Sequence, residues 1–157
     1  MERIVESPVG LLKIAADDRA VTGIWLNARG AVSPGRATGL LADLEQQLAA
    51  YFSGALTEFH LPLAPAGTPF QLEVWAMLRS IPYGTTTSYG RIAERIGRPD
   101  AVRAVGAANG QNPIPLVIPC HRVIGANGSL TGFGGGIEMK RWLLAHESGQ
   151  RSMLTTQ

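Results

Sequence analysis

Residues 62–78 read PLAPAGTPFQLEVWAML, and this stretch marks a change in the character of the chain. Its first part, Pro62–Gly67, is rich in proline and glycine, which is typical of a linker. Its second part opens with Thr68-Pro69-Phe70-Gln71, where threonine can cap a helix, proline fits the first helical position and glutamine can complete a capping box. A helix is therefore expected to begin here. The chain is expected to divide into a scaffold domain over 1–65, a second domain over 66–150 and a tail over 151–157.

The residues before the linker predict an α/β domain, made of an antiparallel sheet and one helix. Turn sequences at Pro8-Val9-Gly10 and Asp17-Asp18-Arg19 separate three β-prone runs, which favours a meander. These runs are Ile4–Val5, Leu11–Ala15 and Val21–Leu26. After a loop over Asn27–Gly39, a helix is expected to end at Gly54, with apolar side chains along one face. Those side chains are Leu41, Leu44, Leu48, Tyr51 and Phe52.

The residues after the linker predict a mostly helical domain that contains a helix-turn-helix. The helix from Thr68 is expected to end before Pro82-Tyr83-Gly84. A second helix is expected over Ser88–Gly97, with Ser88 as its cap, and a third over Asp100–Asn109. Two short helices joined by a tight turn that contains glycine are typical of a helix-turn-helix. A last helix is expected over Ile137–His146.

The third of these helices has two contrasting faces. Its expected core face consists of Ala101, Ala104, Val105 and Ala108. The opposite face carries Arg103 among the small residues Gly106, Ala107 and Gly110. Such a bare face can approach a sugar-phosphate backbone closely, and its single long cation could enter the base stack from the minor groove. The alternative is that the small residues allow tight packing within the protein and that Arg103 is an ordinary solvated side chain.

Composition excludes several classes of protein. With 157 residues, 45% of them hydrophobic, the chain is too apolar for a disordered protein and long enough to bury its own core. No apolar run reaches membrane-helix length, and the first residues lack a signal-peptide pattern, so no membrane association is expected. Residues 1–65 carry five basic and seven acidic side chains (−2), whereas 66–157 carry nine and five (+4). A polyanionic partner would therefore be expected to bind the second half of the chain.

Cysteine and histidine usage indicates a reducing compartment and no metal site. The single cysteine, Cys120, excludes an internal disulfide, and a lone thiol is best kept in the cytoplasm. The three histidines, His60, His121 and His146, are too scattered to suggest metal ligands.

The surroundings of Cys120 indicate a candidate nucleophile. Leu116-Val117-Ile118 predicts a buried strand that leads into Pro119-Cys120-His121-Arg122. Because a nearby imidazole and a positive charge lower the pKa of a thiol, we expect the pKa of Cys120 to lie below the ~8.5 of a free cysteine. The alternative is a buried cysteine that acts as a small hydrophobe, since adjacency in sequence does not prove contact.

Three flanking features complete the candidate site. Upstream, Asn112-Pro113-Ile114-Pro115 predicts a stiff loop that Asn112 can brace. Downstream, the glycines of Thr131–Gly136 permit close approach to a planar ligand but lack the pattern of a phosphate-binding loop. Glu147 follows the last helix, where the helix dipole disfavours an acid, so either another group holds it or it is solvated.

Ile118-Pro119-Cys120-His121-Arg122-Val123 resembles the active-site motif of the O6-alkylguanine-DNA alkyltransferases, or methylated-DNA–protein-cysteine methyltransferases. The resemblance covers about Thr68–Glu147 in the order and spacing of that family. Four further blocks carry it: Ser88-Tyr89, Ala101–Gly106, Gly110–Pro113 and Trp142–Glu147. The first half resembles the variable N-terminal domain of the family only in its general layout.

The resemblance implies a monomeric suicide repair protein that needs no cofactor. It would bind duplex DNA through the minor groove, rotate an O6-alkylguanine out of the stack and move the alkyl group irreversibly onto Cys120. His121, oriented by Glu147 and acting through a water, would take the thiol proton. Tyr89 would donate toward N3 of the base, and Asn112 would brace the loop that holds Cys120.

The resemblance also implies residues that contact DNA and the base. Arg103 would fill the vacated stack, with Ser88, Ala104 and Gly106 at the DNA surface. The base pocket would be lined by Tyr89, Pro115, Val123, Phe133 and Gly134. Phe133 and Gly134 stand where some members carry tyrosine and serine, so the resemblance does not fix the width of the base pocket. Some members bind zinc through cysteines of the N-terminal domain. Because that half of this chain has no cysteine, the zinc site is expected to be absent.

Two other classes of function stay open on the residues alone. One is a lesion-binding or regulatory DNA module in which Cys120 is structural. The other is a Cys–His hydrolase or thiol transferase that acts on small substrates. A sister group of the family binds lesions without repair and lacks the cysteine, so the presence of Cys120 favours chemistry.

Overall fold

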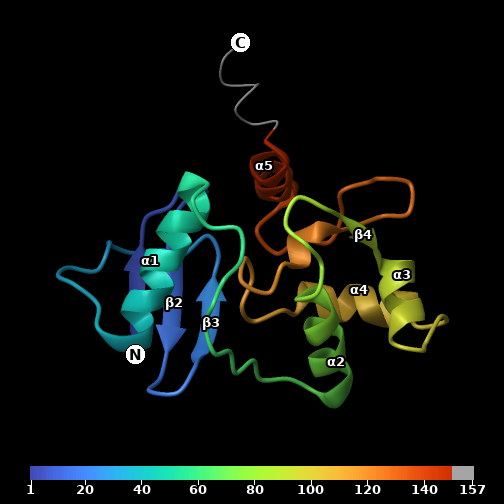
Figure 1. Ribbon diagram of the computed structural model, residues 1–157, viewed down its shortest axis with the longest axis horizontal. Coiled ribbons are helices and arrows are strands. Elements are labelled where there is room, and N and C mark those ends of the chain that lie inside the picture. Colours follow the sequence, from blue (N-terminus) through green and yellow to red (C-terminus); the bar gives the residue numbers. More distant parts are fainter. Residues whose placement is uncertain (150–157) are drawn as a thin grey trace, which may run out of the picture. The chain divides into compact units, whose positions relative to one another are not determined.

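The computed structural model describes residues 1–149, which form two compact units (Figure 1). The first unit consists of Met1–Ala66 together with Pro113–Pro115. The second consists of Gly67–Asn112 together with the chain from Leu116 onward. The tail predicted over 151–157 lies outside the described residues.

The first unit is built on a three-stranded antiparallel sheet. Its strands are β1 (Glu2–Val5), β2 (Leu12–Ala16) and β3 (Val21–Trp25), in the order β1-β2-β3, which confirms the predicted meander. The register pairs Arg3 with Ile14 and Ile14 with Ile24. Leu12 and Ile14 are completely buried, so the middle strand supplies the centre of this core.

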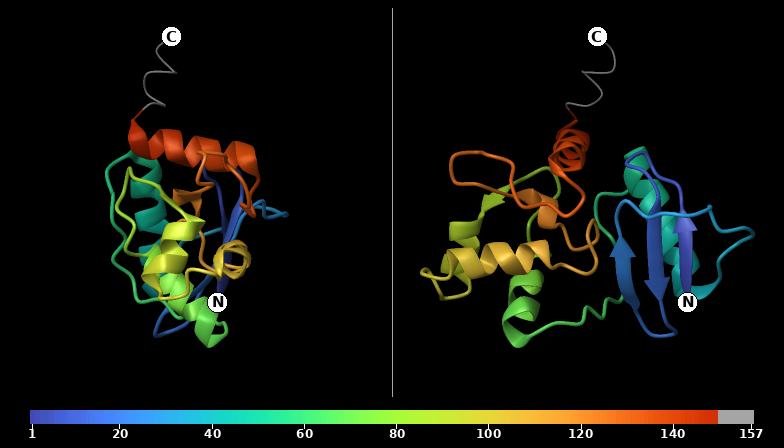
Figure 2. Two further views of the ribbon diagram at one scale, coloured as in Figure 1. Left: turned by 90° about the vertical axis from the view of Figure 1, so that its right-hand side faces the viewer. Right: turned by 180° about the vertical axis from the view of Figure 1, so that it is seen from behind.

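One helix covers a face of the sheet, α1 (Gly39–Ser53) (Figure 2). Four of the five predicted apolar positions are buried, namely Leu41, Leu44, Leu48 and Tyr51. The helix ends where predicted, because Gly54 adopts a left-handed conformation (φ 86°) and its N–H bonds to the carbonyls of Ala50 and Tyr51.

The free edge of β3 takes up two segments that the sequence did not assign to the sheet. Within the predicted linker, the Val21 N–H bonds to the Pro62 carbonyl (2.8 Å) and the Ala64 N–H to the Val21 carbonyl (2.9 Å). The Ile24 N–H bonds to the Pro113 carbonyl (3.0 Å). An edge strand leaves N–H and C=O groups unpaired, so nearby extended chain satisfies them whatever its composition.

The second unit begins with three helices. They are α2 (Pro69–Leu78), α3 (Tyr89–Arg95) and α4 (Val102–Gly110), and α4 packs against both of the others (Figure 1). The predicted capping box is present, with Thr68 and Gln71 bonded reciprocally. Trp75 is buried and its Nε1 donates to the Ala108 carbonyl (2.8 Å), which ties α2 to α4. A side chain at Gly67 would have to displace this ring, since a Cβ there would lie 2.5 Å from it.

The predicted pair of short helices is confirmed, but one face of the second was assigned incorrectly. Gly97 (φ 76°) follows α3, and the chain turns into α4 through residues 98–101. The buried positions of α4 are Val105, Ala108 and Asn109, whereas Ala104 is exposed. Alanine carries too little apolar surface to fix the orientation of a helix, so Val105 and the buried amide of Asn109 decide it.

The segment before the cysteine is not the predicted strand. Residues 116 and 117 form a turn in which Leu116 adopts a left-handed conformation (φ 76°), which a strand residue does not adopt. A short 3₁₀ helix follows, η1 (Cys120–Arg122), and then β5 (Val123–Ile124). β5 pairs in parallel with β4 (Thr87–Ser88).

The last helix of the second unit is α5 (Ile137–Ser148), slightly longer than predicted. Met139 and Leu143 are buried as expected, and Trp142 is half-buried. Lys140 and Glu147 are buried as well, which gives this helix a charged inner face. No helix within residues 1–149 is both long enough and apolar enough to span a membrane.

Candidate active site

The two-stranded pairing of β4 with β5 brings Tyr89 and Cys120 to the same region of the second unit. Thr87 pairs with Val123 and Ser88 with Ile124. Tyr89 opens α3 immediately after β4, and η1 with Cys120 ends immediately before β5. Two segments that lie about thirty residues apart in sequence are thus held side by side by backbone pairing.

Asparagine side chains fix the loop that carries Cys120. Asn112 donates from Nδ2 to the Ile118 carbonyl (2.8 Å), which is the bracing contact expected from the sequence. Asn109, which sequence reasoning had not singled out, donates from Nδ2 to the Cys120 carbonyl (3.3 Å). Cys120 itself is 5% exposed. Its backbone is therefore held from α4 and from the residues just after that helix.

A buried ionic cluster lies next to Cys120 in sequence. His121 Nε2 is 2.6 Å from Glu147 Oε2, and both side chains are almost completely buried. Arg122 donates to the same carboxylate from Nε (2.8 Å) and Nη2 (3.1 Å). Its Nη1 donates to the Ile81 carbonyl (2.7 Å). Glu147 is therefore held by two partners, which settles the choice that the sequence left open.

The protonation states in this cluster follow from its contacts. Burial alone would raise the pKa of Glu147, but the hydrogen bonds and charges of His121 and Arg122 hold that pKa well below its usual range. Burial lowers the pKa of His121, although Glu147 opposes this. A neutral imidazole beside an ionised carboxylate places its proton on Nε2, which donates to Glu147. Nδ1 is then an acceptor, and within residues 1–149 it has no hydrogen-bond partner.

The expectation of a lowered thiol pKa is wrong for this state of the chain. Burial raises the pKa of Cys120 to about 11, and neither His121 nor Arg122 offsets this. The hydrogen bond from Asn112 and the charge of Lys140 act in the opposite direction. Sequence adjacency misled the prediction because both neighbours direct their side chains to Glu147. The resting thiol is therefore protonated.

Tyr89 supplies a hydrogen-bond donor to the candidate site. Its hydroxyl donates to the Thr131 carbonyl (2.9 Å). Burial raises the pKa of Tyr89, so the hydroxyl keeps its proton at neutral pH. A Cβ on Gly106 would lie 3.9 Å from the Tyr89 ring, so the backbone of α4 approaches this ring closely.

Lys140 is the main residue that sequence reasoning missed. Its side chain is completely buried, and its Nζ donates to the Thr131 carbonyl (2.7 Å). The sequence did contain a signal for this burial. Lys140 lies three residues before Leu143 and seven before Glu147, and it therefore shares their face of α5. A lysine at such a position is easily read as a solvated residue at the margin of the core.

The residues predicted to contact DNA are placed on or near α4. Arg103 and Ala104 are exposed on α4, and Gly106 is half-buried beside Tyr89. Ser88 is occupied as the cap of α3, where its hydroxyl accepts from the Arg91 N–H (3.2 Å). Nothing in the structure tests their contact with DNA, so these roles stay predictions.

The residues predicted to line a base pocket are spread over three segments. Val123 is completely buried in β5. Phe133 is half-buried and Gly134 exposed, both in the loop before α5. Pro115 is buried and belongs to the segment that clusters with the first unit. The role of Pro115 at the base stays a prediction.

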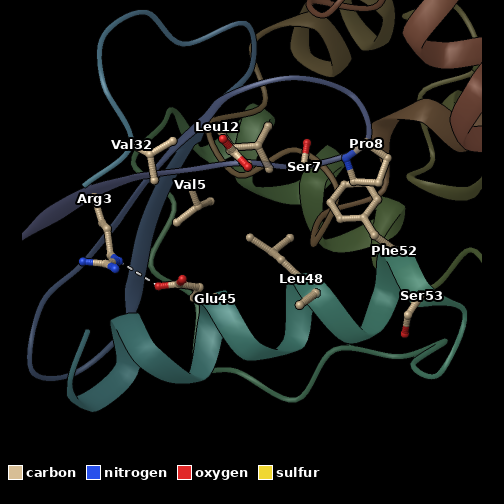
Figure 3. Close-up of a pocket in the computed structure, with 12 residues that line it drawn as sticks. Arg3, Val5, Ser7, Pro8, Leu12, Val32, Glu45, Leu48, Phe52 and Ser53 are labelled. Atoms are coloured by element: carbon tan, nitrogen blue, oxygen red, sulfur yellow. Dashed lines mark hydrogen bonds and ion pairs between the residues drawn. The ribbon is translucent and has the colours of Figure 1, made fainter. Parts of the chain in front are cut away.

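The first unit contains a cavity of its own, about 530 Å³ in volume, between the sheet and α1 (Figure 3). Apolar side chains dominate its wall, among them Val5, Leu12, Leu48 and Phe52 (Figure 3). Arg3 and Glu45 form an ion pair in this wall (2.8 Å). The wall contains neither a histidine nor a cysteine, so no imidazole or thiol lines it. Within residues 1–149, no three His, Cys, Asp or Glu side chains are grouped so as to hold a metal ion.

The second unit therefore combines a cysteine thiol, a His–Glu pair and a tyrosine donor with two short packed helices, and these features together define the class of protein to which the chain can belong. Two family models match the chain. The 6-O-methylguanine DNA methyltransferase, DNA binding domain, matches residues 69–149, and the ribonuclease-like domain of the same methyltransferase matches residues 1–65. The chain belongs to the 6-O-methylguanine DNA methyltransferase family.

Individual relatives agree with this assignment. The methylated-DNA–protein-cysteine methyltransferase of Mycolicibacterium paratuberculosis is 52% identical, over 92% of this chain and 90% of the relative. The protein of the same name from Methanosarcina acetivorans is 44% identical, over 92% of this chain and 96% of the relative. The crystal structure of Mycobacterium tuberculosis OGT in complex with DNA matches with a TM-score of 0.85 at 48% identity, covering 95% of this chain and 93% of that one.

Proposed function

We propose that this chain repairs DNA by moving an alkyl group from O6-alkylguanine onto its own Cys120, as a methylated-DNA–protein-cysteine methyltransferase. The observation that carries the proposal is the hydrogen bond between His121 Nε2 and Glu147, which leaves Nδ1 free as an acceptor in the segment that holds the only cysteine. Family membership and relatives of this name at about 50% identity support the same activity.

The reaction balances with the groups of the second unit. His121 Nδ1 takes the thiol proton, through a water, and the resulting imidazolium is stabilised by the Glu147 carboxylate. The thiolate attacks the alkyl carbon, so that an S–C bond forms while the C–O6 bond breaks and its electron pair stays on the guanine. Tyr89 donates its hydroxyl toward N3, where it stabilises this growing negative charge. The product is a thioether that cannot be reduced back to a thiol, so each molecule acts once.

The DNA would be duplex and would meet α4 from its minor groove. Arg103 is the exposed cation of this helix, and the adjacent Ala104 offers no bulk that would hold a backbone away. A buried thiol cannot reach O6 within a stacked duplex, so the base must leave the stack, at a cost of a few kcal/mol. Arg103 would occupy the gap, and Ser88 and Gly106 would be further residues at the DNA surface. The complex of the 48%-identical relative with DNA supports a DNA partner.

The flipped base would sit between Tyr89 and the loop before α5, with Val123, Phe133 and Gly134 as further lining residues. All the groups that the reaction requires come from one chain, so a monomer suffices. No cofactor takes part in the proposed steps.

Intact mass spectrometry tests the proposal directly. After incubation with a duplex oligonucleotide that contains O6-methylguanine, we expect one added methyl group on Cys120 and saturation at one equivalent. An unmethylated duplex and the Cys120→Ser variant are the controls, and neither should give a mass shift. Binding without a mass shift would indicate a lesion-binding module instead. Catalytic turnover of small thioesters without DNA would indicate a hydrolase.

A further inference from the structure

Two buried side-chain atoms beside Cys120 have no hydrogen-bond partner within residues 1–149. They are Oδ1 of Asn109 and Nδ1 of His121. Asn109 is 1% exposed and His121 is completely buried, so bulk solvent does not reach either atom. A buried polar atom without a partner is costly, and native proteins leave few of them. Two such atoms at the candidate nucleophile therefore indicate a shared ligand.

The side-chain amide of Asn109 lies against the peptide that joins Cys120 to His121. Its Nδ2 donates to the Cys120 carbonyl (3.3 Å), which belongs to that peptide. This bond fixes the direction in which the amide faces, because the reverse orientation would set two acceptor oxygens against each other. Oδ1 is attached to the same carbon as Nδ2, so it is held in one orientation next to these two residues.

Asn109 Oδ1 and His121 Nδ1 are both acceptors, so they cannot satisfy each other. Oδ1 is an amide oxygen, and Nδ1 carries no proton because Nε2 donates to Glu147 (2.6 Å). A single partner for both atoms must carry two hydrogens. The Cys120 thiol has only one, whereas a water molecule has two and keeps lone pairs that can accept the thiol proton. Buried waters typically bind polar atoms that have no other partner.

Bracing of the loop does not by itself explain why position 109 is an asparagine. The bracing contact is made by Asn112, whose Nδ2 is 2.8 Å from the Ile118 carbonyl. Asn109 shares the buried face of α4 with Val105 and Ala108. A leucine would suit such a position without the cost of burying an amide. The amide retained there uses its nitrogen end for a backbone contact, which leaves its oxygen end for a ligand.

We propose that Asn109 is a positioning residue for the deprotonation of Cys120, because its Oδ1 holds the water through which the thiol proton reaches His121. The water donates one hydrogen to Asn109 Oδ1 and the other to His121 Nδ1, and its oxygen faces the thiol. As the S–H proton moves to the water oxygen, the hydrogen on the Nδ1 side moves to the imidazole. A thiolate and an imidazolium are formed, and the water is restored.

The use of this proton rests on the proposed function, whereas the water site does not depend on DNA. The site is therefore tested first on the wild-type protein alone. A crystal structure that resolves ordered waters should contain one within hydrogen-bond distance of both Asn109 Oδ1 and His121 Nδ1. The nitrogen NMR signal of His121 Nδ1, assigned by its loss in His121→Gln, should be that of an acceptor with a hydrogen bond. A site without this water, or an Nδ1 signal of an unbonded acceptor, would overturn the proposal.

The role of Asn109 is tested with Asn109→Leu, which keeps the branched shape of the side chain and removes both polar atoms. Gln111→Leu is the matched control, because Gln111 carries an exposed amide at the end of the same helix. Circular dichroism establishes that both variants are folded. In Asn109→Leu the Nδ1 signal should move toward that of an unbonded acceptor, and in Gln111→Leu it should not move.

Two single-turnover rates are then compared, methyl transfer from the methylated duplex and benzyl transfer from free O6-benzylguanine. Both reactions require removal of the thiol proton, so for Asn109→Leu we expect both rates to fall by the same factor, about tenfold. The affinity for an unmethylated duplex should be unchanged, because the reaction and not the binding of DNA is affected. Gln111→Leu should match the wild type in all three measurements.

The outcomes separate this proposal from the proposed function. Wild-type rates of Asn109→Leu with both substrates would overturn the role of Asn109 and leave the proposed function intact. A loss restricted to the duplex would also overturn it, because Asn109 would then act on the placement of α4 against DNA. A wild-type protein that never takes up an alkyl group would overturn the proposed function, while the crystal structure and the Nδ1 signal still test the water site. If Asn109→Leu does not fold, these two wild-type measurements decide.

Discussion

Glu147 is the residue on which the buried cluster depends, because His121 and Arg122 both donate to its carboxylate. Glu147→Gln keeps the shape of the side chain but removes its charge, so Arg122 is left buried without a counter-ion. Loss of one partner of a buried ion pair costs about 3 kcal/mol or more. The imidazolium that forms during transfer also loses its stabilisation, and we expect a decrease of about 100-fold in the single-turnover rate of methyl transfer.

Glu138→Gln is the matched control for this prediction. Glu138 lies on the same helix, α5, and pairs with Arg141 at the surface, where its side chain is 89% exposed. An exposed pair of this kind contributes little to stability, so the control should unfold and react like the wild type. Denaturant unfolding and intact mass together separate the two effects. Equal behaviour of the two variants would remove Glu147 from the mechanism.

The sequence predicted single residues where a local rule constrains them. An acid at the C-terminal end of a helix is either held by another group or solvated, and Glu147 is held. The resemblance implied His121 as its partner, whereas Arg122 was not predicted, because it lies 25 residues away and only the packing of η1 on α5 brings it there. The thiol pKa was predicted incorrectly because adjacent residues in the 3₁₀ turn direct their side chains differently, and those of His121 and Arg122 go to Glu147.

At the scale of elements, α4 combines a buried face that packs on α2 and α3 with an exposed face that carries Arg103. Arg103→Ala should slow repair of a methylated duplex by about tenfold or more, because nothing then fills the gap left by the flipped base. Alkylation by free O6-benzylguanine requires no base flipping and should be unchanged. The ratio of these two rates is the quantity to measure.

Arg91→Ala is the control for the loss of one positive charge from the same unit. Arg91 lies on α3 and its side chain is exposed, while the cap of α3 uses only its backbone N–H. A small loss of duplex affinity without a change in the ratio of the two rates is expected. If Arg103→Ala slowed both substrates equally, Arg103 would not act at the flipped base.

Elements were predictable where their signals were local. The capping box at Thr68 and the glycine that ends α1 each depend on only a few adjacent residues, and the structure contains both. The run Leu116–Ile118 looked like a strand because apolar residues suit both strands and buried turns. The exposed side of Ala104 was missed because small residues give the hydrophobic pattern of a helix little weight.

At the scale of the molecule, the buried polar side chains are gathered in one unit. Within residues 1–149 they are Asn109, His121, Arg122, Lys140 and Glu147, and all belong to the second unit. The first unit has a core without buried charge, and its acid with a lowered pKa, Asp17, is an exposed residue held by the N–H groups of Arg19 and Ala20. The pH dependence of stability should therefore originate in the second unit.

The direction of that dependence follows from His121 and Glu147, whose folded-state pKa values both lie below their ordinary values of 6.5 and 4.5. The unfolded chain therefore binds more protons than the folded chain as the pH falls, so acid favours unfolding. The melting temperature should be constant between about pH 7.5 and pH 8, begin to fall below about 6.5 as unfolded His121 binds a proton, and fall more steeply below about 4.5. Asp17→Asn should follow the wild-type curve closely, whereas Glu147→Gln should lose the steep portion. A melting temperature that stayed level from pH 8 to pH 4 would show that neither buried group is held in the protonation state that the mechanism requires.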